Sequence, residues 1–306
     1  MNRASPTLPI LLLLICVFSW GSVFPIAKQV LLEMSDLALA IWRFVIAIVC
    51  LGAYLGLRRL SWPRLALWQY AVVLLIGALG IGGFNLALFG GLRQTSATNG
   101  ALIMALSPLT TSLISSLLGS HRLSRVQWLG MVLGLAGVLL VITQGHPAQL
   151  LRLQINHGDL LVLLAMLTWC GYTLASQAVG RWLPSLPLTL LSMLAGLGAL
   201  LLTGLLLPGS HPWQGLGQLS GGALLGVFYI GLLSTVLGYL FWLQGIQALG
   251  APKASLYYNL VPVFAALVAL ALGQPLSQIQ LVGMLVVLLG LTAPLWLPRL
   301  RLPLLS

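Results

Sequence analysis

The chain has 306 residues, of which 59% are hydrophobic and 6% are charged, and its mean hydropathy is +1.06. Soluble globular chains carry about 25% charged residues, so these values exclude a soluble fold and indicate an integral membrane protein. The formal net charge of +11 does not predict nucleic-acid binding, because the basic residues fall in short connections between apolar runs. We therefore expect a lipid bilayer as partner and no nucleic acid.

Apolar runs of about 20 residues, the length that crosses a bilayer, occur ten times along the chain. They cover residues 8–28, 37–57, 66–91, 95–118, 125–143, 159–180, 186–207, 220–244, 251–272 and 278–297. The first run follows Arg3 as in a signal peptide, but no small-x-small cleavage motif precedes Trp20, so we interpret it as a span. The expected fold is an all-α membrane protein with ten transmembrane helices.

Basic residues in the connections predict the orientation, because they concentrate on the cytoplasmic side. With a cytoplasmic N-terminus, the inside residues are Arg3, Arg58, Arg59, Arg64, Arg122, Arg125, Arg181, Lys253, Arg299 and Arg301. The outside residues are then only Lys28, Arg93 and Arg152. Both termini are expected in the cytoplasm.

The three cysteines, Cys16, Cys50 and Cys170, lie inside apolar runs and show no C-x-x-C spacing. Neither a zinc site nor a disulfide framework fits this pattern, and buried cysteines commonly serve as small apolar side chains. No metal and no cofactor are expected.

The chain repeats itself: LGSHRLSRVQWLGM at 118–131 returns as LGQPLSQIQLVGM at 272–284. The alignment also pairs Pro108 with Pro262 and, more weakly, Trp20 with Trp169. We expect two five-helix halves, 1–147 and 148–306. Because five is odd, the second half enters the membrane from the opposite side, which makes an inverted repeat of the kind that alternating-access transporters use.

Several motifs resemble the EamA-type drug/metabolite transporter family over essentially the whole chain. They are Trp20-Gly21 with Lys28, Trp42-Arg43-Phe44, the Pro108 and Pro262 helices and the hinge GSHRLSRVQWLG at 119–130. The resemblance implies a ten-helix carrier of the bacterial inner membrane, often an exporter of amino acids or related metabolites. It also implies a central cavity lined by the first, third, fourth, sixth, eighth and ninth helices, and a first and a second half that are each EamA-like.

The hinges depart from the family pattern. Family members commonly carry a Glu just before the Leu-Ser of each hinge, whereas this chain has His121 and Gln274. A carboxylate there would bind a cation or relay protons. His121 is a candidate titrating group, with an interfacial hydrogen-bonding role as the alternative.

Polar and aromatic residues away from the span ends are the candidate substrate-binding residues, because each must find a protein partner or line a wet cavity. On the helices that the family implies, they are Trp20, Phe24, Phe84, Asn85, Met104, Ser107, Trp169, Tyr172, Tyr239, Trp242, Tyr257, Tyr258 and Asn259. Trp169 with Tyr172 and Tyr239 with Trp242 share helix faces, so a box of aromatic faces is one interpretation. Helix packing or an aromatic belt is the other.

The roles of five polar or helix-breaking residues within the spans are considered separately. Asn85 and Asn259 either bind the polar end of a substrate or tie helices together. Pro108 and Pro262 are expected to bend two helices as hinges. Arg43, inside the second span, is a candidate charge partner, either for Asp36 and helix-end carbonyls or for a substrate carboxylate.

These features predict a transporter that moves a small neutral or zwitterionic solute by alternating access through an aromatic-lined cavity, as a monomer. The alternative is a multidrug or cationic compound exporter, which typically needs a membrane-embedded carboxylate that this chain lacks. A channel or scaffold is a third class. A membrane-embedded enzyme fits poorly, because all four histidines fall in or beside connections and no carboxylate is central.

Overall fold

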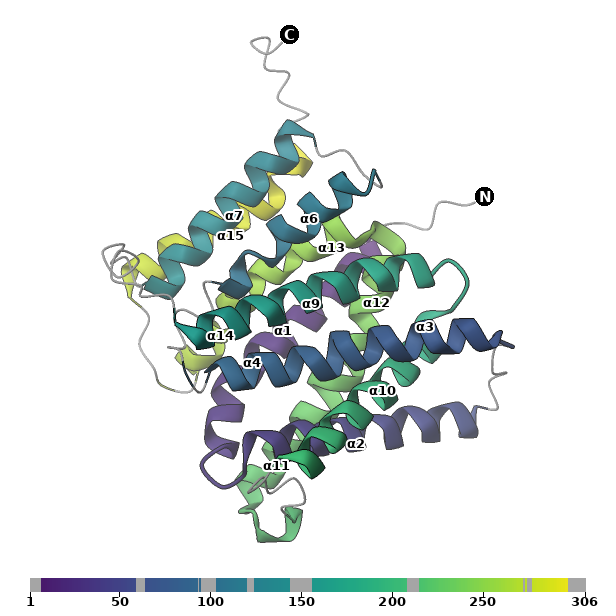
Figure 1. Cartoon of the computed structure of the whole chain (residues 1–306). Coiled ribbons are helices and arrows are strands. Elements are labelled where there is room, and N and C mark those ends of the chain that lie inside the picture. The colour runs from purple at the N-terminus through teal and green to yellow at the C-terminus, as the bar shows by residue number, and fades with distance from the viewer. Residues whose placement is uncertain are drawn as a thin grey trace, which may run out of the picture.

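The structure is a computed structural model that describes residues 7–58, 64–92, 94, 103–119, 124–143, 156–207, 215–271, 273 and 277–296. Within these ranges the regular elements are helices, which form one bundle (Figure 1). Those of the first half are α1 (Thr7–Val30), α2 (Asp36–Leu57), α3 (Leu67–Gly77), η1 (Ala78–Gly83), α4 (Phe84–Leu92), α6 (Ser107–Leu117) and α7 (Arg125–Thr143). Those of the second half are α9 (His157–Val179), α10 (Ser185–Leu206), η2 (Leu216–Gln218), α11 (Gly221–Tyr229), η3 (Ile230–Leu237), α12 (Gly238–Leu249), α13 (Ala251–Leu256), η4 (Tyr257–Asn259), α14 (Leu260–Ala271) and α15 (Gln278–Trp296).

Six helical runs among the described residues are long and apolar enough to cross a membrane. They are Thr7–Ala27, Asp36–Leu57, Leu67–Leu88, His157–Val179, Ser185–Leu206 and Gly221–Leu249. Two shorter apolar helices, Trp128–Leu140 and Gln278–Thr292, accompany them. An all-helical, multi-span membrane protein is thus confirmed, whereas the count of ten spans stays a prediction.

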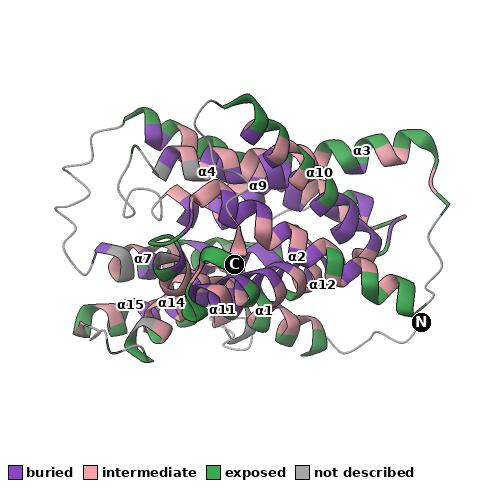
Figure 2. Ribbon diagram, turned by 90° about the horizontal axis from the view of Figure 1, so that it is seen from below, coloured by how far each residue is buried: buried purple, intermediate pink, exposed green. Residues whose placement is uncertain are grey.

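The outer faces of the helices are apolar, as contact with lipid requires. In α1, the exposed side chains Leu8, Leu11, Ile15 and Phe18 recur every three or four residues, so they form one stripe. Figure 2 shows exposed residues on the outside of the bundle and buried ones toward its middle. This surface has the character of a transmembrane bundle rather than of a soluble protein.

Helix starts are fixed by side-chain caps. The Ser35 hydroxyl accepts from the Ala38 N–H at the start of α2, and the Ser220 hydroxyl accepts from the Ala223 N–H at the start of α11. Asn156 and Asp159 exchange hydrogen bonds with each other's backbone at the start of α9. These bonds satisfy donors that the first helical turn leaves free.

Two π-helical segments interrupt the runs that the sequence predicts as continuous spans. η1 follows α3 in the third span of the first half, and η3 follows α11 in the third span of the second half. The two segments therefore occupy equivalent places in the repeat. Such segments are rare and occur frequently at functional sites, because they redirect backbone carbonyls and side chains.

The helices α7 and α15 pack closely at the edge of the bundle (Figure 1). A Cβ added at Gly137 would lie 2.6 Å from the Gly283 carbonyl oxygen, and one added at Gly290 would lie 2.7 Å from the Gly130 carbonyl oxygen. The sequence repeat pairs Gly137 with Gly290 and Gly130 with Gly283, so these two contacts are equivalent. Small residues let two transmembrane backbones approach in this way.

The two prolines do not interrupt continuous helices. Pro108 is the second residue of α6, directly after a turn at Leu106, and Pro262 is the third residue of α14, directly after the 3-10 turn η4. Proline is tolerated in the first turn of a helix, where its missing N–H has no intrahelical partner. The breaks thus precede the prolines, which differs from the expected mid-helix bend.

Candidate functional site

A cavity of about 380 Å³ lies in the bundle. Its inner end is formed by Trp20, Trp169, Tyr239 and Tyr258, and its other end by Leu31 and Leu32 after α1. Leu32 is 85% exposed, so the cavity reaches the surface at the end of the bundle where α1 ends and α2 begins. The volume falls within the range of about 300–1,000 Å³ that is typical of small-molecule sites.

An aromatic cluster forms the inner end of the cavity. It consists of Trp20, Phe84, Trp169, Tyr172, Tyr239, Trp242 and Tyr258. The Trp20 ring lies with its centroid 5.4 Å from that of Trp169 and 5.2 Å from that of Trp242, and the Trp169 and Trp242 rings stack 5.7 Å apart. These separations are those of favourable aromatic pairs, so the cluster is a rigid wall to which both halves contribute.

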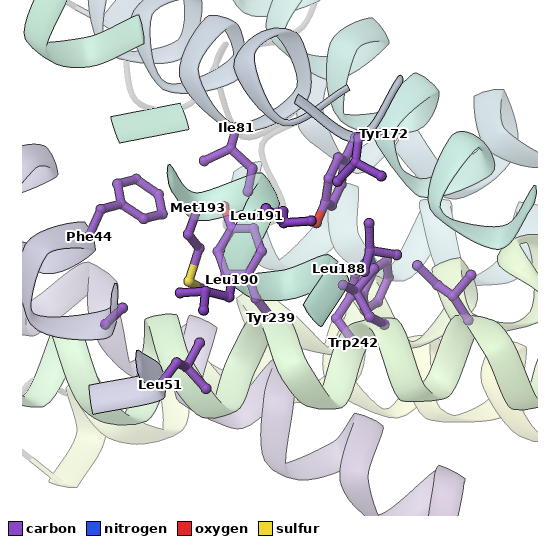
Figure 3. Packing of buried hydrophobic residues seen from close by; sticks show 14 of the residues in the cluster. Phe44, Leu51, Ile81, Tyr172, Leu188, Leu190, Leu191, Met193, Tyr239 and Trp242 are labelled. Atoms are coloured by element: carbon purple, nitrogen blue, oxygen red, sulfur yellow. The ribbon is translucent and has the colours of Figure 1, made fainter. Parts of the chain in front are cut away.

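Part of this cluster is packed behind the cavity. Figure 3 shows Tyr172 from α9 and Tyr239 and Trp242 from α12 with Leu188, Leu190, Leu191 and Met193 of α10. Trp242 is completely buried and Tyr172 nearly so. These two rings support the wall, whereas Trp20, Phe84, Trp169, Tyr239 and Tyr258 face the cavity.

The π-helical segment η3 supplies polar anchors beside the wall. The Trp20 Nε1–H donates to the Ser234 carbonyl oxygen over 3.0 Å. The Thr235 hydroxyl donates to the carbonyl of Ile230, the first residue of the same segment, over 2.8 Å. The Trp20 ring is therefore held in a fixed position on the second half of the chain.

Arg43 of α2 brings a positive charge to the cavity. Its Nε–H donates to the Thr235 hydroxyl over 3.1 Å, and its guanidinium carbon lies 5.0 Å from the centroid of the Phe44 ring. The Phe44 ring in turn lies 6.2 Å from that of Tyr239 in the aromatic cluster. The charge thus lies next to the aromatic wall.

The three carboxylates of the chain lie elsewhere. Glu33 accepts from the N–H and the hydroxyl of Ser220, Asp36 accepts from the Leu37 N–H at the start of α2, and Asp159 caps α9. Two hydrogen bonds to the anion lower the pKa of Glu33, the backbone N–H of Ser220 having the larger effect. Among the described side chains that line the cavity, Arg43 is therefore the only charged one.

The bundle is closed at the end opposite the mouth of the cavity. A Cβ added at Gly245 of α12 would overlap the Leu13 side chain of α1. The Gln177 side-chain oxygen accepts from the Ala251 N–H over 2.8 Å, and the Gln247 side-chain amide donates to the Leu183 carbonyl over 3.3 Å. Among the described residues the cavity opens at one end and close packing occupies the other, which is the geometry of one state of an alternating-access carrier.

The model of the EamA-like transporter family matches residues 7–143 and, a second time, residues 156–293. This chain belongs to the EamA-like transporter family. The double match shows the two-repeat architecture of the family.

Several relatives of this EamA-like protein are named as transporters. "Uncharacterized transporter YyaM" of Bacillus subtilis is 34% identical over 92% of this chain and 91% of its own. "Probable amino-acid metabolite efflux pump" of Salmonella typhimurium is 27% identical over 92% of both chains. "Probable terminal-alkyne amino-acid exporter" of Streptantibioticus cattleyicolor is 24% identical over 89% of this chain and 88% of its own.

A solved crystal structure has the same fold as this EamA-like protein. It superposes with a TM-score of 0.78, at 20% identity, over 97% of this chain and 100% of the other chain. At this identity the likeness shows the fold alone.

The remaining candidate residues of the sequence, apart from Asn85, are not among the described lining residues of the cavity. Asn85 borders the cavity, and its amide donates to the Ile81 carbonyl over 2.7 Å. Met104 and Ser107 are buried, and the Asn259 amide lies against Gly134 of α7, as in a tie between helices. Tyr257 packs against the hydrophobic core. His121 and the side chain of Phe24 lie outside the described residues.

Sequence reasoning missed the aliphatic part of the cavity and its polar anchors. Val23, Ala27 and Leu88 line the cavity without any feature that separates them from lipid-facing residues. The adjacent hydroxyls of Ser234 and Thr235, in the middle of the predicted span 220–244, were a usable signal. Polar residues at that depth need a partner, and the Thr235 hydroxyl finds partners in the Ile230 carbonyl and in Arg43.

Proposed function

We propose that this EamA-like protein transports a small neutral or zwitterionic organic solute, amino acids or related metabolites, out of the cell by alternating access. The main support for this proposal is the cavity, which has an aromatic wall from both halves, one positive charge and no described carboxylate. Two relatives whose names mention amino-acid export support this choice of solute.

The membrane arrangement belongs to the same proposal. It comprises ten spans in two inverted five-helix repeats, 1–147 and 148–306, in the bacterial inner membrane, with both termini in the cytoplasm and a monomer as the working unit. In this orientation α1 ends outside, so the cavity faces outward and the closed end faces the cytoplasm. A cationic drug fits this cavity less well, because its charge would meet Arg43 without a carboxylate to offset the repulsion.

Proteoliposomes of the purified chain test the proposal through exchange of labelled L-phenylalanine and L-leucine. We expect saturable exchange that Trp169→Ala reduces at least about tenfold, because this ring contacts several others of the aromatic wall. Trp128→Ala, at an exposed position of α7, is the matched control and should exchange like the wild type. Absence of exchange of both amino acids in the wild type would overturn the amino-acid assignment.

A further inference from the structure

Among the residues that the structure describes, Arg43 has no counter-ion, and the other described walls of its cavity are neutral. The described lining contains aromatic rings, aliphatic side chains, Asn85 and Ser234, but no Asp, Glu, Lys or His besides it. A charged side chain inside a membrane is costly unless it is paired, so such residues usually mark a binding site or an ion pathway. The unpaired charge therefore needs an explanation from function.

The hydrogen bonds of Arg43 leave most of its donors available. A guanidinium has five N–H donors, and within the described part of the chain its recorded hydrogen bond is the one from Nε to Thr235. That bond fixes the plane of the group. Arg43 is only half-buried although it lies within the bundle, because its surface faces the cavity.

The surroundings of the charge define what can bind it. Two parallel N–H donors of a guanidinium match the two oxygens of a carboxylate. A phosphate dianion would call for a second cation, and the described walls supply none. On the inner side, Trp20, Phe84 and Tyr239 offer apolar faces to the rest of the solute.

We propose that Arg43 binds the carboxylate of the transported solute, so that the cavity selects carboxylic acids, including α-amino acids, over amines and neutral analogues. This assignment rests on the proposed function, because it places the solute in the same cavity. The apolar part of the solute lies against the aromatic wall, and the carboxylate supplies the counter-charge that Arg43 lacks.

Binding to the purified full chain tests this assignment, with intrinsic tryptophan fluorescence as the signal because Trp20 and Trp169 line the cavity. The probes are 3-phenylpropionate, its amide 3-phenylpropanamide, phenethylamine and L-phenylalanine. The two acids should bind at least about tenfold more tightly than the amide and the amine. Equal affinities for acid and amide, tighter binding of the amine, or no binding of any probe would overturn the assignment.

Substitution of Arg43 then measures the contribution of its guanidinium to binding of the carboxylate. Arg43→Gln should weaken 3-phenylpropionate binding at least about tenfold and leave the amide unchanged, so that the amide reports an intact fold. The affinity of Arg43→Lys for 3-phenylpropionate should lie between those of the wild type and Arg43→Gln. Lysine keeps the positive charge but lacks the two parallel N–H donors of the guanidinium. Arg58→Gln is the matched control, since Arg58 directly follows α2, lies near the Tyr54 ring and is not among the lining residues of the cavity. Unchanged acid binding in Arg43→Gln would contradict the proposal.

The proposal and the transport function fail in different ways. Acid-selective binding without any exchange in proteoliposomes would refute transport and leave the role of Arg43 intact. Exchange that does not distinguish acids from amines would refute the role of Arg43 and leave transport intact.

Discussion

At the scale of single residues, Trp20 links the two halves of the chain. Its ring touches Trp169, Tyr239, Trp242 and Tyr258, all of the second half, and its N–H reaches the Ser234 carbonyl of η3. A residue with so many partners positions the wall of the cavity. The equivalent residue of the repeat, Trp169, contacts it directly, so the two equivalent tryptophans meet near the centre of the bundle.

Glu33 provides a pH-dependent contact at the mouth of the cavity. Its two carboxylate oxygens each lie 2.7 Å from Ser220, one from the backbone nitrogen and one from the hydroxyl. These bonds favour the anion and lower the pKa of Glu33, so the contact adds stability at neutral pH and loses it as the pH falls through that lowered value. The loss should therefore occur below about pH 4.3, the ordinary pKa of a glutamate.

Comparison of wild type with Glu33→Gln measures this contact. The melting temperature of the wild type in detergent should exceed that of the variant at pH 7, and the difference should shrink as the pH falls below about 4.3. All other residues are the same in both proteins, so their contributions cancel in the difference. A difference that is constant from pH 7 to pH 3 would show that Glu33 does not bind Ser220 as an anion.

At the scale of elements, the α7 and α15 pair depends on glycine. Gly137→Ala should lower the stability by about 1–3 kcal/mol, because the added Cβ would lie 2.5 Å from the Val287 nitrogen and force the helices apart. Gly52→Ala in α2 is the matched control, since no atom lies within 4 Å of the added Cβ, and alanine favours the helix. The measurement is unfolding of both variants in detergent, and an equal effect of both would contradict a close glycine contact.

The sequence predicted the helices and the composition of the aromatic wall better than their local geometry. Apolar runs and the repeat indicate spans because their causes are local, and the Trp and Tyr spacing placed Trp169 with Tyr172 on one face. The π-helical segments η1 and η3 were missed, because apolar periodicity does not separate a π-helical turn from a continuous α-helical span. The hydrogen-bond partners of the Asn85 and Asn259 side chains likewise depend on which helices lie beside them, so the sequence alone does not predict them.

At the scale of the whole molecule, buried polar groups mark the closed end of the bundle. Thr173 Oγ1 is buried without a hydrogen-bond partner in the part of the chain that the structure describes, and the buried hydroxyls of Ser176 and Ser192 lie beside the buried Tyr172 hydroxyl. Unpaired buried hydroxyls are costly, so we expect water to reach them when the bundle opens at this end. These residues of α9 and α10 then line the path on the other side of the membrane.

Cysteine accessibility tests this opening in a chain whose Cys16, Cys50 and Cys170 are replaced by Ala. Without solute, Ala27→Cys in the cavity wall should react with an impermeant maleimide from the outside, and Ser176→Cys should not. Leu32→Cys at the mouth, which is 85% exposed, is the control for reagent access. Faster labelling of Ser176→Cys than of Ala27→Cys would contradict the account, because it would place the opening at the end that the structure shows as closed.

The central claim is that this protein is a carrier whose two halves expose one central site alternately. Counterflow measures this most directly: proteoliposomes loaded with unlabelled L-phenylalanine are diluted into a trace of labelled L-phenylalanine, with and without a pH gradient. The account predicts that label accumulates transiently above its equilibrium level, to the same extent in both conditions, because no described carboxylate in the cavity couples transport to protons. A monotonic rise to equilibrium would indicate a pore, and accumulation that requires the gradient would contradict transport without proton coupling.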